Sequence, residues 1–200
     1  MKILAIADIH GLQYRLNIVL KNIEKYSPEL VIICGDITQF GPGELAINFL
    51  NQIPTETLVI TGNIDTPDVE KAIDESKATN ISLKKVIKKG ISFIGISEVI
   101  QDDFKIIKEK KILDEKIVLI SHKPPYGAQD KIFIGMHGGS KELRAIIEKF
   151  KPYLVLCGHI HEDPGFSKIG ETMVVNCSMG KKGEGAIIEI NEDISVIMLD

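Results

Sequence analysis

The first eleven residues, MKILAIADIHG (1–11), contain the pattern on which the fold assignment rests. The apolar run over residues 2–7 predicts a buried β-strand, which ends at Asp8 with His10 two positions later. Residues i and i+2 of an extended segment point to the same side. The Asp8 carboxylate and the His10 imidazole are therefore expected to face one common site at the end of this strand.

Apolar runs and helical patterns alternate along the first third of the chain. Strands are predicted over residues 2–7, 30–36 and 57–63, and helices over 12–26, 42–53 and 67–77. Strands and helices that alternate at this spacing predict parallel strands joined by right-handed crossovers. The first third thus indicates an α/β fold.

The pattern changes after residue 80. Two strands around a turn at Lys89-Gly90 are predicted within 86–97, and a charged helix is predicted over 104–116. A strand over 116–125, a loop over 126–139, a helix over 140–150 with Ser140 as N-cap and a strand over 153–161 follow. Three further strands are predicted at 172–178, 185–190 and 194–200. No linker interrupts the chain, so a single domain of residues 1–200 is expected, with two sheets inside and helices outside.

Composition excludes some classes of protein. The formal net charge of -4 argues against a large electrostatic footprint for nucleic acid. No apolar run approaches the roughly 20 residues that span a bilayer, so no membrane partner is expected. The three cysteines lie in apolar runs without CxxC spacing, which favours buried thiols in a reducing compartment. A cytoplasmic location is the expectation.

Five predicted strands end on side chains that can bind metal. In open α/β sheets, ligands gather outside the carboxyl ends of the strands, so residues far apart in the sequence can converge there. The candidates comprise two aspartates, one asparagine and four histidines. They are Asp8, His10, Asp36, Asn63, His122, His159 and His161.

This mixture of oxygen and imidazole ligands suits zinc, manganese or iron better than calcium. Seven side chains exceed the needs of one ion and fit two ions that share a carboxylate. Two such ions clamp a phosphoryl group and lower the pKa of a bridging water, which gives hydroxide near neutral pH. The pattern predicts two divalent ions, manganese first, with zinc, iron or nickel as alternatives.

The motifs D-x-H (8–10), G-D (35–36), G-N (62–63), a histidine after a strand (122) and G-H-x-H (158–161) resemble those of the calcineurin-like metallophosphoesterase superfamily. The similarity runs from Met1 to about Gly165 and is nearest to the small prokaryotic phosphoesterases. It implies a four-layer α-β-β-α sandwich with two mixed β-sheets. It also implies a dinuclear phosphoesterase that acts on a small phosphate ester by attack of a metal-bridged hydroxide.

The resemblance also implies how the ligands divide. One ion would take Asp8, His10, Asp36 and His161, and the other would take Asp36, Asn63, His122 and His159. Asp36 would bridge the two ions, because each of its oxygens can serve one of them.

One position departs from the family pattern. Ile64 stands where relatives carry a histidine that protonates the leaving group or contacts the phosphate. General acid catalysis is typically worth about 10²–10⁴-fold, and isoleucine cannot supply it. Phosphodiesters and activated monoesters are therefore the expected substrates, with diesters preferred.

Two further residues are candidates for catalytic roles. His137, in the loop IGMHGGS (134–140), is a candidate replacement acid or phosphate contact, or else an ordinary loop residue. Asp65 is expected to orient a ligand histidine or to stabilise a turn. The amides of Gly138, Gly139 and Ser140, at the start of a helix, would suit a phosphate oxygen.

Two other functions compete with hydrolysis of a small phosphate ester. A non-catalytic interaction scaffold on the same fold is one, although loss of chemistry should erode the ligands and all seven are present. A nuclease is the other, which the acidic charge disfavours. The natural substrate, the physiological metal and the oligomeric state stay open.

Overall fold

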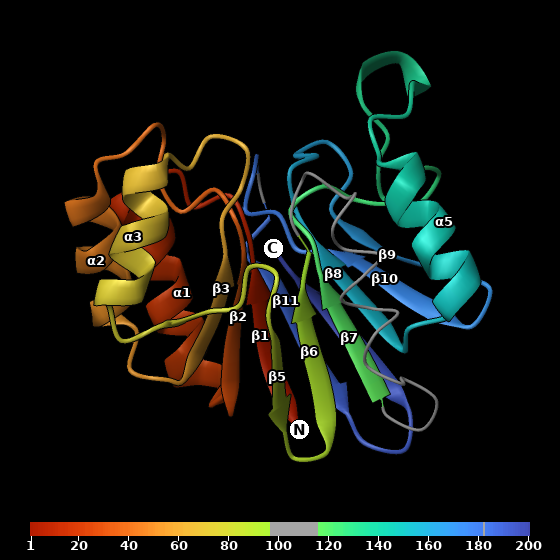
Figure 1. The fold of residues 1–200 in the computed structure, drawn as a ribbon, viewed down its shortest axis with the longest axis horizontal. Coiled ribbons are helices and arrows are strands. Elements are labelled where there is room, and N and C mark those ends of the chain that lie inside the picture. Colours follow the sequence, from red (N-terminus) through yellow and green to blue (C-terminus); the bar gives the residue numbers. More distant parts are fainter. Residues whose placement is uncertain (97–115, 182) are drawn as a thin grey trace.

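Two six-stranded β-sheets pack face to face in the computed structural model, which describes residues 1–96, 116–181 and 183–200 (Figure 1). Hydrophobic residues of both sheets fill the space between them, with Ile3 of one sheet and Phe93 of the other completely buried. The first sheet has the order β12-β11-β1-β2-β3-β4 and the second has the order β5-β6-β7-β8-β10-β9.

The first sheet consists of β1 (Lys2–Ile6), β2 (Leu30–Cys34), β3 (Thr57–Ile60), β4 (Thr79–Asn80), β11 (Gly185–Ile190) and β12 (Ile194–Leu199). The second consists of β5 (Lys85–Lys88), β6 (Ile91–Gly95), β7 (Lys116–Ile120), β8 (Leu154–Cys157), β9 (Gly165–Ile169) and β10 (Thr172–Asn176). Strands β1 to β4 are mutually parallel, as are β6, β7, β8 and β10, whereas β11, β12, β5 and β9 pair antiparallel to their neighbours. Both sheets are therefore mixed.

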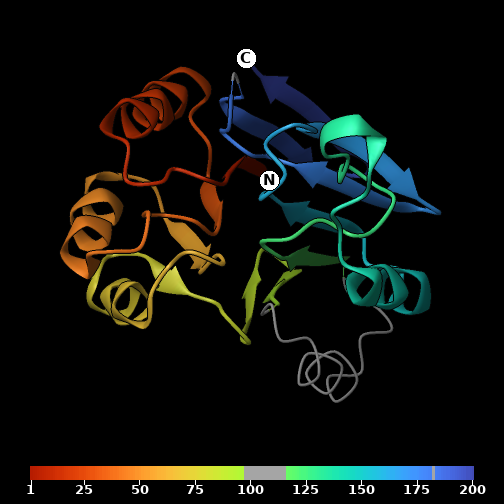
Figure 2. The same cartoon turned by 90° about the horizontal axis from the view of Figure 1, so that it is seen from above.

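Helices cover the outer faces of the two sheets (Figure 2). Helices α1 (Gln13–Tyr26), α2 (Gly43–Gln52) and α3 (Pro67–Glu75) pack on the first sheet, and α5 (Lys141–Phe150) packs on the second. Side chains alternate across each strand, so in β1 Ile3 points into the space between the sheets while Leu4 and Ile6 face the helices. The four-layer α-β-β-α arrangement with two mixed sheets is confirmed.

The predicted elements correspond closely to the observed ones. The parallel pairing of β1, β2 and β3 is confirmed, as are the β5–β6 hairpin and the Ser140 cap, whose side chain accepts a 3.0 Å hydrogen bond from Leu143 N. Strands β4 and β9 were not predicted. The first has only two residues and the second alternates partly exposed with exposed positions along most of its length, so neither has a buried apolar run. The charged helix predicted over 104–116 lies almost wholly outside the described residues.

Two properties of the described chain bear on its environment. None of its helices combines the length and the apolar composition that a bilayer crossing requires. Cys34, Cys157 and Cys177 are free and buried, as the sequence predicted.

Candidate metal centre

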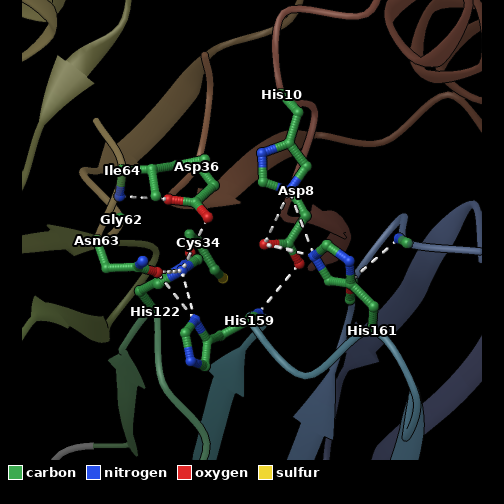
Figure 3. Close-up of polar contacts among 12 residues, drawn as sticks. Asp8, His10, Cys34, Asp36, Gly62, Asn63, Ile64, His122, His159 and His161 are labelled. Atoms are coloured by element: carbon green, nitrogen blue, oxygen red, sulfur yellow. Dashed lines mark hydrogen bonds and ion pairs between the residues drawn. The ribbon is translucent and has the colours of Figure 1, made fainter. Parts of the chain in front are cut away.

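The seven predicted ligands come together where strands from both sheets end. Asp8 and His10 follow β1, Asp36 follows β2, Asn63 follows β3, His122 follows β7, and His159 and His161 follow β8. Figure 3 shows their side chains pointing into one region. Residue Ala7, at the end of β1, forms a parallel bridge with Ser178 after β10, so the two sheets meet beside this region.

One group of potential ligands comprises Asp8, His10 and His161. Their ligand atoms all lie within 4.8 Å of one another. His10 Nε2 is 3.3 Å from His161 Nε2, and His161 Nε2 is 3.5 Å from Asp8 Oδ1. Two imidazoles and a carboxylate at these distances can share one cation.

A second group comprises Asp8, Asp36 and His122, whose ligand atoms satisfy the same 4.8 Å limit. His122 Nε2 lies 3.3 Å from Asp36 Oδ2 and 2.9 Å from Asn63 Oδ1. The same amide oxygen lies 2.9 Å from His159 Nδ1. Asp8 therefore belongs to both groups, and Asn63 and His159 adjoin the second.

The polar atoms of this region fit a pair of bound cations. Asp8 is completely buried, yet its Oδ1 accepts no hydrogen bond from any described residue, and the buried His10 Nδ1 also has no partner there. A buried carboxylate oxygen without a hydrogen bond is costly unless a positive charge lies close to it, as a protonated His161 at 3.5 Å or a bound cation would. His122 Nε2 and His159 Nδ1 face each other at 3.2 Å, where two lone pairs could converge on an ion. Oxygen and imidazole donors suit manganese, zinc or iron.

Four of the seven residues have a left-handed backbone. The φ angles are 63° at Asp8, 54° at His10, 53° at Asp36 and 69° at His159. Residues with side chains adopt this conformation at a cost of about 1–2 kcal/mol each. Strain of this kind gathers where function requires a particular side-chain direction. The backbone thus turns sharply after β1, β2 and β8 and aims these four side chains at the common region.

Buried contacts hold Asp8 in place. Its Oδ2 accepts a 3.0 Å hydrogen bond from His159 N, which ties the two sheets together at the site. Its backbone carbonyl accepts a hydrogen bond from Nη1 of Arg15, a residue of α1 that is only 8% exposed. Sequence reasoning missed Arg15. The available signal was a rare arginine one turn after D-x-H in a chain whose other basic residues are nearly all lysine.

Two glycines leave room for the aspartates. A Cβ on Gly62 would lie 2.1 Å from Asp36 Oδ1, and one on Gly158 would lie 2.9 Å from Asp8 Oδ2 and 2.3 Å from the Ala7 Cβ. All three distances are shorter than a real Cβ atom can approach another heavy atom. The glycines in the G-N and G-H-x-H motifs are therefore required by close approach to the two carboxylates.

Asp65 contacts backbone amides. Its two carboxylate oxygens accept hydrogen bonds from the N–H groups of Ile37, Thr38 and Gly62 at 3.0–3.1 Å. Burial raises the pKa of Asp65, although these amides oppose that effect. Among the described residues, none of its hydrogen-bond partners is a ligand histidine. Asp65 thus clamps the loop of Asp36 to the turn that carries Asn63.

Burial and paired charges shift the histidines in different directions. Burial by itself would lower the pKa of His122, but the hydrogen bond and the charge of Asp36 raise it to about 9. Contact with Asp8 raises the pKa of His161, whereas burial lowers the pKa values of His10 and His159. Burial would raise the pKa of Asp8, but the neighbouring His161 and His122 lower it. Without metal, protonated His122 and His161 therefore lie beside the ionised carboxylates of Asp36 and Asp8.

His137 lies outside the seven-residue cluster, in the loop 126–139. Its Nδ1 is 2.7 Å from Asp130 Oδ1, a partner that sequence reasoning missed. The expectation that the amides of Gly138, Gly139 and Ser140 bind phosphate is wrong. These amides donate to Asp130 O, Asp130 Oδ2 and Pro124 O, so the loop itself occupies them.

Comparison with known proteins agrees with this fold. The chain is 35% identical to the protein MJ1162 of Methanocaldococcus jannaschii over 200 residues, which cover 89% of this chain and 88% of that protein. It is 28% identical to a probable glycerophosphodiester phosphodiesterase, GpdQ, of Arcobacter nitrofigilis, over 77% of this chain and 64% of that protein. The crystal structure of TT1561 of Thermus thermophilus superposes with a TM-score of 0.75 at 15% identity, with 98% of each chain covered.

The sequence profile of one protein family matches most of the chain. That family is described as calcineurin-like phosphoesterase, and the match covers residues 1–163. All seven predicted ligands lie inside the matched range. The chain therefore belongs to the calcineurin-like phosphoesterase family.

Proposed function

We propose that this protein hydrolyses small phosphodiesters with two divalent metal ions. One observation carries the proposal: four ligand side chains, His10, Asp36, His122 and His161, gather with a buried Asp8 whose Oδ1 has no hydrogen-bond partner among the described residues, and Asn63 and His159 adjoin them. Family membership supports phosphoesterase chemistry at this place in the fold.

The proposed ligand sets are those that the family resemblance implies, and they place Asp36, where the two groups above share Asp8, between the ions. One ion would be held by Asp8, His10, Asp36 and His161, and the other by Asp36, Asn63, His122 and His159, with Asp36 shared. Bound divalent ions of this kind supply positive charge to a phosphoryl group and make a water molecule acidic near neutral pH. Manganese is the proposed ion, with zinc, iron and nickel as alternatives, because oxygen and imidazole ligands accept all four.

The chain's own residues supply orientation. The His159 amide fixes the direction of the Asp8 carboxylate, and the Ile64 amide, 3.2 Å from Asp36 Oδ1, does the same for Asp36. The carbonyl of Cys34 accepts from His122 Nδ1 at 2.8 Å, which leaves His122 Nε2 to face the region between the ligands. Fixing the outer nitrogen of a ligand histidine sets its tautomer and ring orientation.

The preference for diesters rests on position 64. Its isoleucine side chain cannot protonate a leaving group, so esters that need strong acid assistance should react slowly. The name of the relative from Arcobacter nitrofigilis, a probable glycerophosphodiester phosphodiesterase, supports the same class of substrate. The three free, buried cysteines support a reducing compartment such as the cytoplasm.

Metal removal and replacement test the proposal. The protein is stripped with a strong chelator and then assayed for hydrolysis of bis-p-nitrophenyl phosphate with manganese, zinc, iron or nickel added in turn. We expect no activity without metal and recovery with manganese. Asp36→Asn should remain inactive, and Asp74→Asn, which alters an exposed carboxylate on α3, should recover like the wild type.

Two results would overturn this function. Two bound ions per chain without hydrolysis of any phosphodiester or phosphomonoester in a panel would favour a non-catalytic scaffold. Cleavage of plasmid or single-stranded DNA in preference to small esters would favour a nuclease.

A further inference from the structure

The loop 126–139 contains a buried carboxylate that the proposed metal ligands do not explain. Asp130 is 1% exposed, and its Oδ2 accepts 3.0 Å hydrogen bonds from Gly127 N and Gly139 N. Its backbone carbonyl accepts a 2.9 Å hydrogen bond from Gly138 N. The loop therefore folds around Asp130 and fixes the orientation of its carboxylate.

The other oxygen of this carboxylate holds His137. His137 Nδ1 lies 2.7 Å from Asp130 Oδ1, and the His137 side chain is 34% exposed. Because an ionised carboxylate only accepts hydrogen bonds, Nδ1 carries the proton and Nε2 is the ring nitrogen left for an external partner. The ring also lies beside Tyr126, with centroids 5.1 Å apart. An imidazole oriented in this way by a buried carboxylate is the arrangement that enzymes use for directed proton transfer.

Hydrogen bonds fasten this loop to the turn after the G-H-x-H motif. Asp163 Oδ2 accepts from Lys131 N at 3.0 Å, and Asp163 O accepts from Gln129 Nε2 at 3.4 Å. Nδ2 of the buried Asn176 donates both to Gln129 O at 3.3 Å and to Ile160 O at 2.8 Å. The loop and the ligand-bearing turn are thus fixed relative to each other.

The loop also approaches this turn at the residue after His137. A Cβ added to Gly138 would lie 3.1 Å from Cδ1 of Ile160, the residue between the ligands His159 and His161. Figure 1 shows that the loop rises beyond the strand ends of the second sheet, above α5. His137 therefore precedes a residue that packs directly against the metal-binding turn.

We propose that His137 is the general acid of the reaction and that Asp130 is its positioning residue. This inference rests on the proposed phosphodiesterase function. As the bond between phosphorus and the leaving oxygen breaks, its electron pair stays on that oxygen, which takes a proton from His137 Nε2. The attacking water forms the new bond to phosphorus and loses its proton to solvent. His137 keeps its Nδ1 proton, which stays hydrogen-bonded to the Asp130 carboxylate, and regains its Nε2 proton from solvent.

An acid at His137 would replace the proton donor that position 64 lacks. Ile64 supplies no proton, whereas alkyl esters leave as strongly basic alkoxides. A positioned acid typically accelerates such a step by about 10²–10⁴-fold. A p-nitrophenyl group leaves with less assistance, so the contribution of His137 depends on the leaving group.

Leaving-group dependence provides the kinetic test. Metal-loaded wild type, His137→Gln and Asp130→Asn are assayed on methyl phosphodiesters whose leaving groups range from p-nitrophenol to simple alcohols. In both variants, turnover should fall by about 10²-fold or more on the alkyl esters and by much less on the p-nitrophenyl ester. Glu142→Gln is the matched control, because this exposed carboxylate contacts Ser140 at the end of the same loop.

Nitrogen NMR of the imidazole provides a second test that does not depend on activity. In wild type, the neutral His137 ring should carry its proton on Nδ1. In Asp130→Asn, the amide oxygen must still serve Gly127 N and Gly139 N, so the amide NH₂ faces Nδ1 and the proton should move to Nε2. An unchanged tautomer would show that Asp130 does not orient the ring, whereas the leaving-group kinetics show whether the oriented ring acts as the acid.

The outcomes separate this inference from the proposed function. Unchanged leaving-group dependence in His137→Gln, with two ions bound and wild-type hydrolysis intact, overturns the inference alone. A wild-type Nε2–H tautomer also overturns it. Absence of hydrolysis in the wild type overturns the proposed function instead, and the NMR result still reports on the Asp130–His137 pair.

Discussion

The backbone amide of Ile64 donates a 3.2 Å hydrogen bond to Oδ1 of Asp36. Position 64 therefore supports the carboxylate assigned to both ions through its main chain, which any residue except proline could do. Its side chain is free to differ from the histidine of relatives without loss of this contact. The hydrogen bond that supports Asp36 and the presence or absence of an acidic side chain at position 64 are therefore independent of each other.

Ile64→His should restore the missing acid. Because the backbone hydrogen bond to Asp36 does not depend on the side chain, metal binding should be unchanged. Turnover on phosphomonoesters with poor leaving groups should rise about 10-fold or more. Steady-state kinetics on alkyl phosphates check this, with Ile64→Leu as the control. No gain in a variant that still binds two ions would refute our account of this position.

Gly62→Ala should disable the centre through steric conflict. The new Cβ would lie 2.1 Å from Asp36 Oδ1 and 2.5 Å from Asp36 N, so the carboxylate must move. We expect metal affinity to fall by about 100-fold, within the range seen when support for metal ligands is lost. Gly90→Ala is the control, because a Cβ there would meet nothing within 4 Å; its φ of +75° strains the backbone of an alanine but touches no ligand. Calorimetric titration with manganese would show equal affinities if the Gly62 contact is unimportant.

Asp65→Ala should weaken both the fold and the metal site. The substitution leaves the amides of Ile37, Thr38 and Gly62 without their acceptor. Hydrogen bonds to charged groups contribute about 1.5–3 kcal/mol each and are not additive, so we expect the free energy of unfolding to fall by about 2–4 kcal/mol. Asp65→Asn, which keeps one oxygen, should lose less. Equal stability of wild type and Asp65→Ala in urea denaturation would contradict the clamp.

The titration of His122 makes metal binding dependent on pH. In the metal-free protein its pKa is raised from 6.5 to about 9, so at pH 7 the ring is protonated and must lose its proton to bind an ion. Manganese affinity should therefore rise from pH 6.5 to 9. Calorimetry at pH 7 in buffers of different ionisation enthalpy should show release of about one proton or more per chain. Binding without proton release would show that His122 does not lose a proton to the ion, which would contradict its assignment as a ligand.

The same shift sets the stability of the metal-free chain. A raised folded-state pKa stabilises the fold fully below the unfolded value of 6.5 and loses this contribution as the pH rises through about 9. His10 and His159 have lowered pKa values, so they destabilise the fold mainly below the unfolded pKa of 6.5. Above pH 7 this destabilisation has nearly gone, and it does not oppose the loss of stability caused by His122. The melting temperature of the chelated protein should fall from pH 7 to 9.5. A rise over this interval would be incompatible with the Asp36–His122 pair.

The sequence was most informative where a buried run ends on polar side chains. The apolar composition of β1, β2, β3, β7 and β8 is sufficient to predict them as buried strands. Because neighbouring strands of this kind are parallel, ligands at their carboxyl ends lie at the same edge. Edge strands β4 and β9 lack that signature. The contacts of Arg15 with Asp8 and of Asp130 with His137 escaped because both depend on how loops pack, which no local pattern encodes. The supposed phosphate-binding amides failed for the same reason, since Asp130 occupies two of them.

Anomalous diffraction from crystals of the manganese-loaded protein tests the central claim most directly. Our account predicts two manganese peaks per chain, one between Asp8, His10 and His161 and the other between Asn63, His122 and His159, with Asp36 touching both. A single peak, peaks elsewhere on the molecule, or no peak at saturating manganese would contradict it.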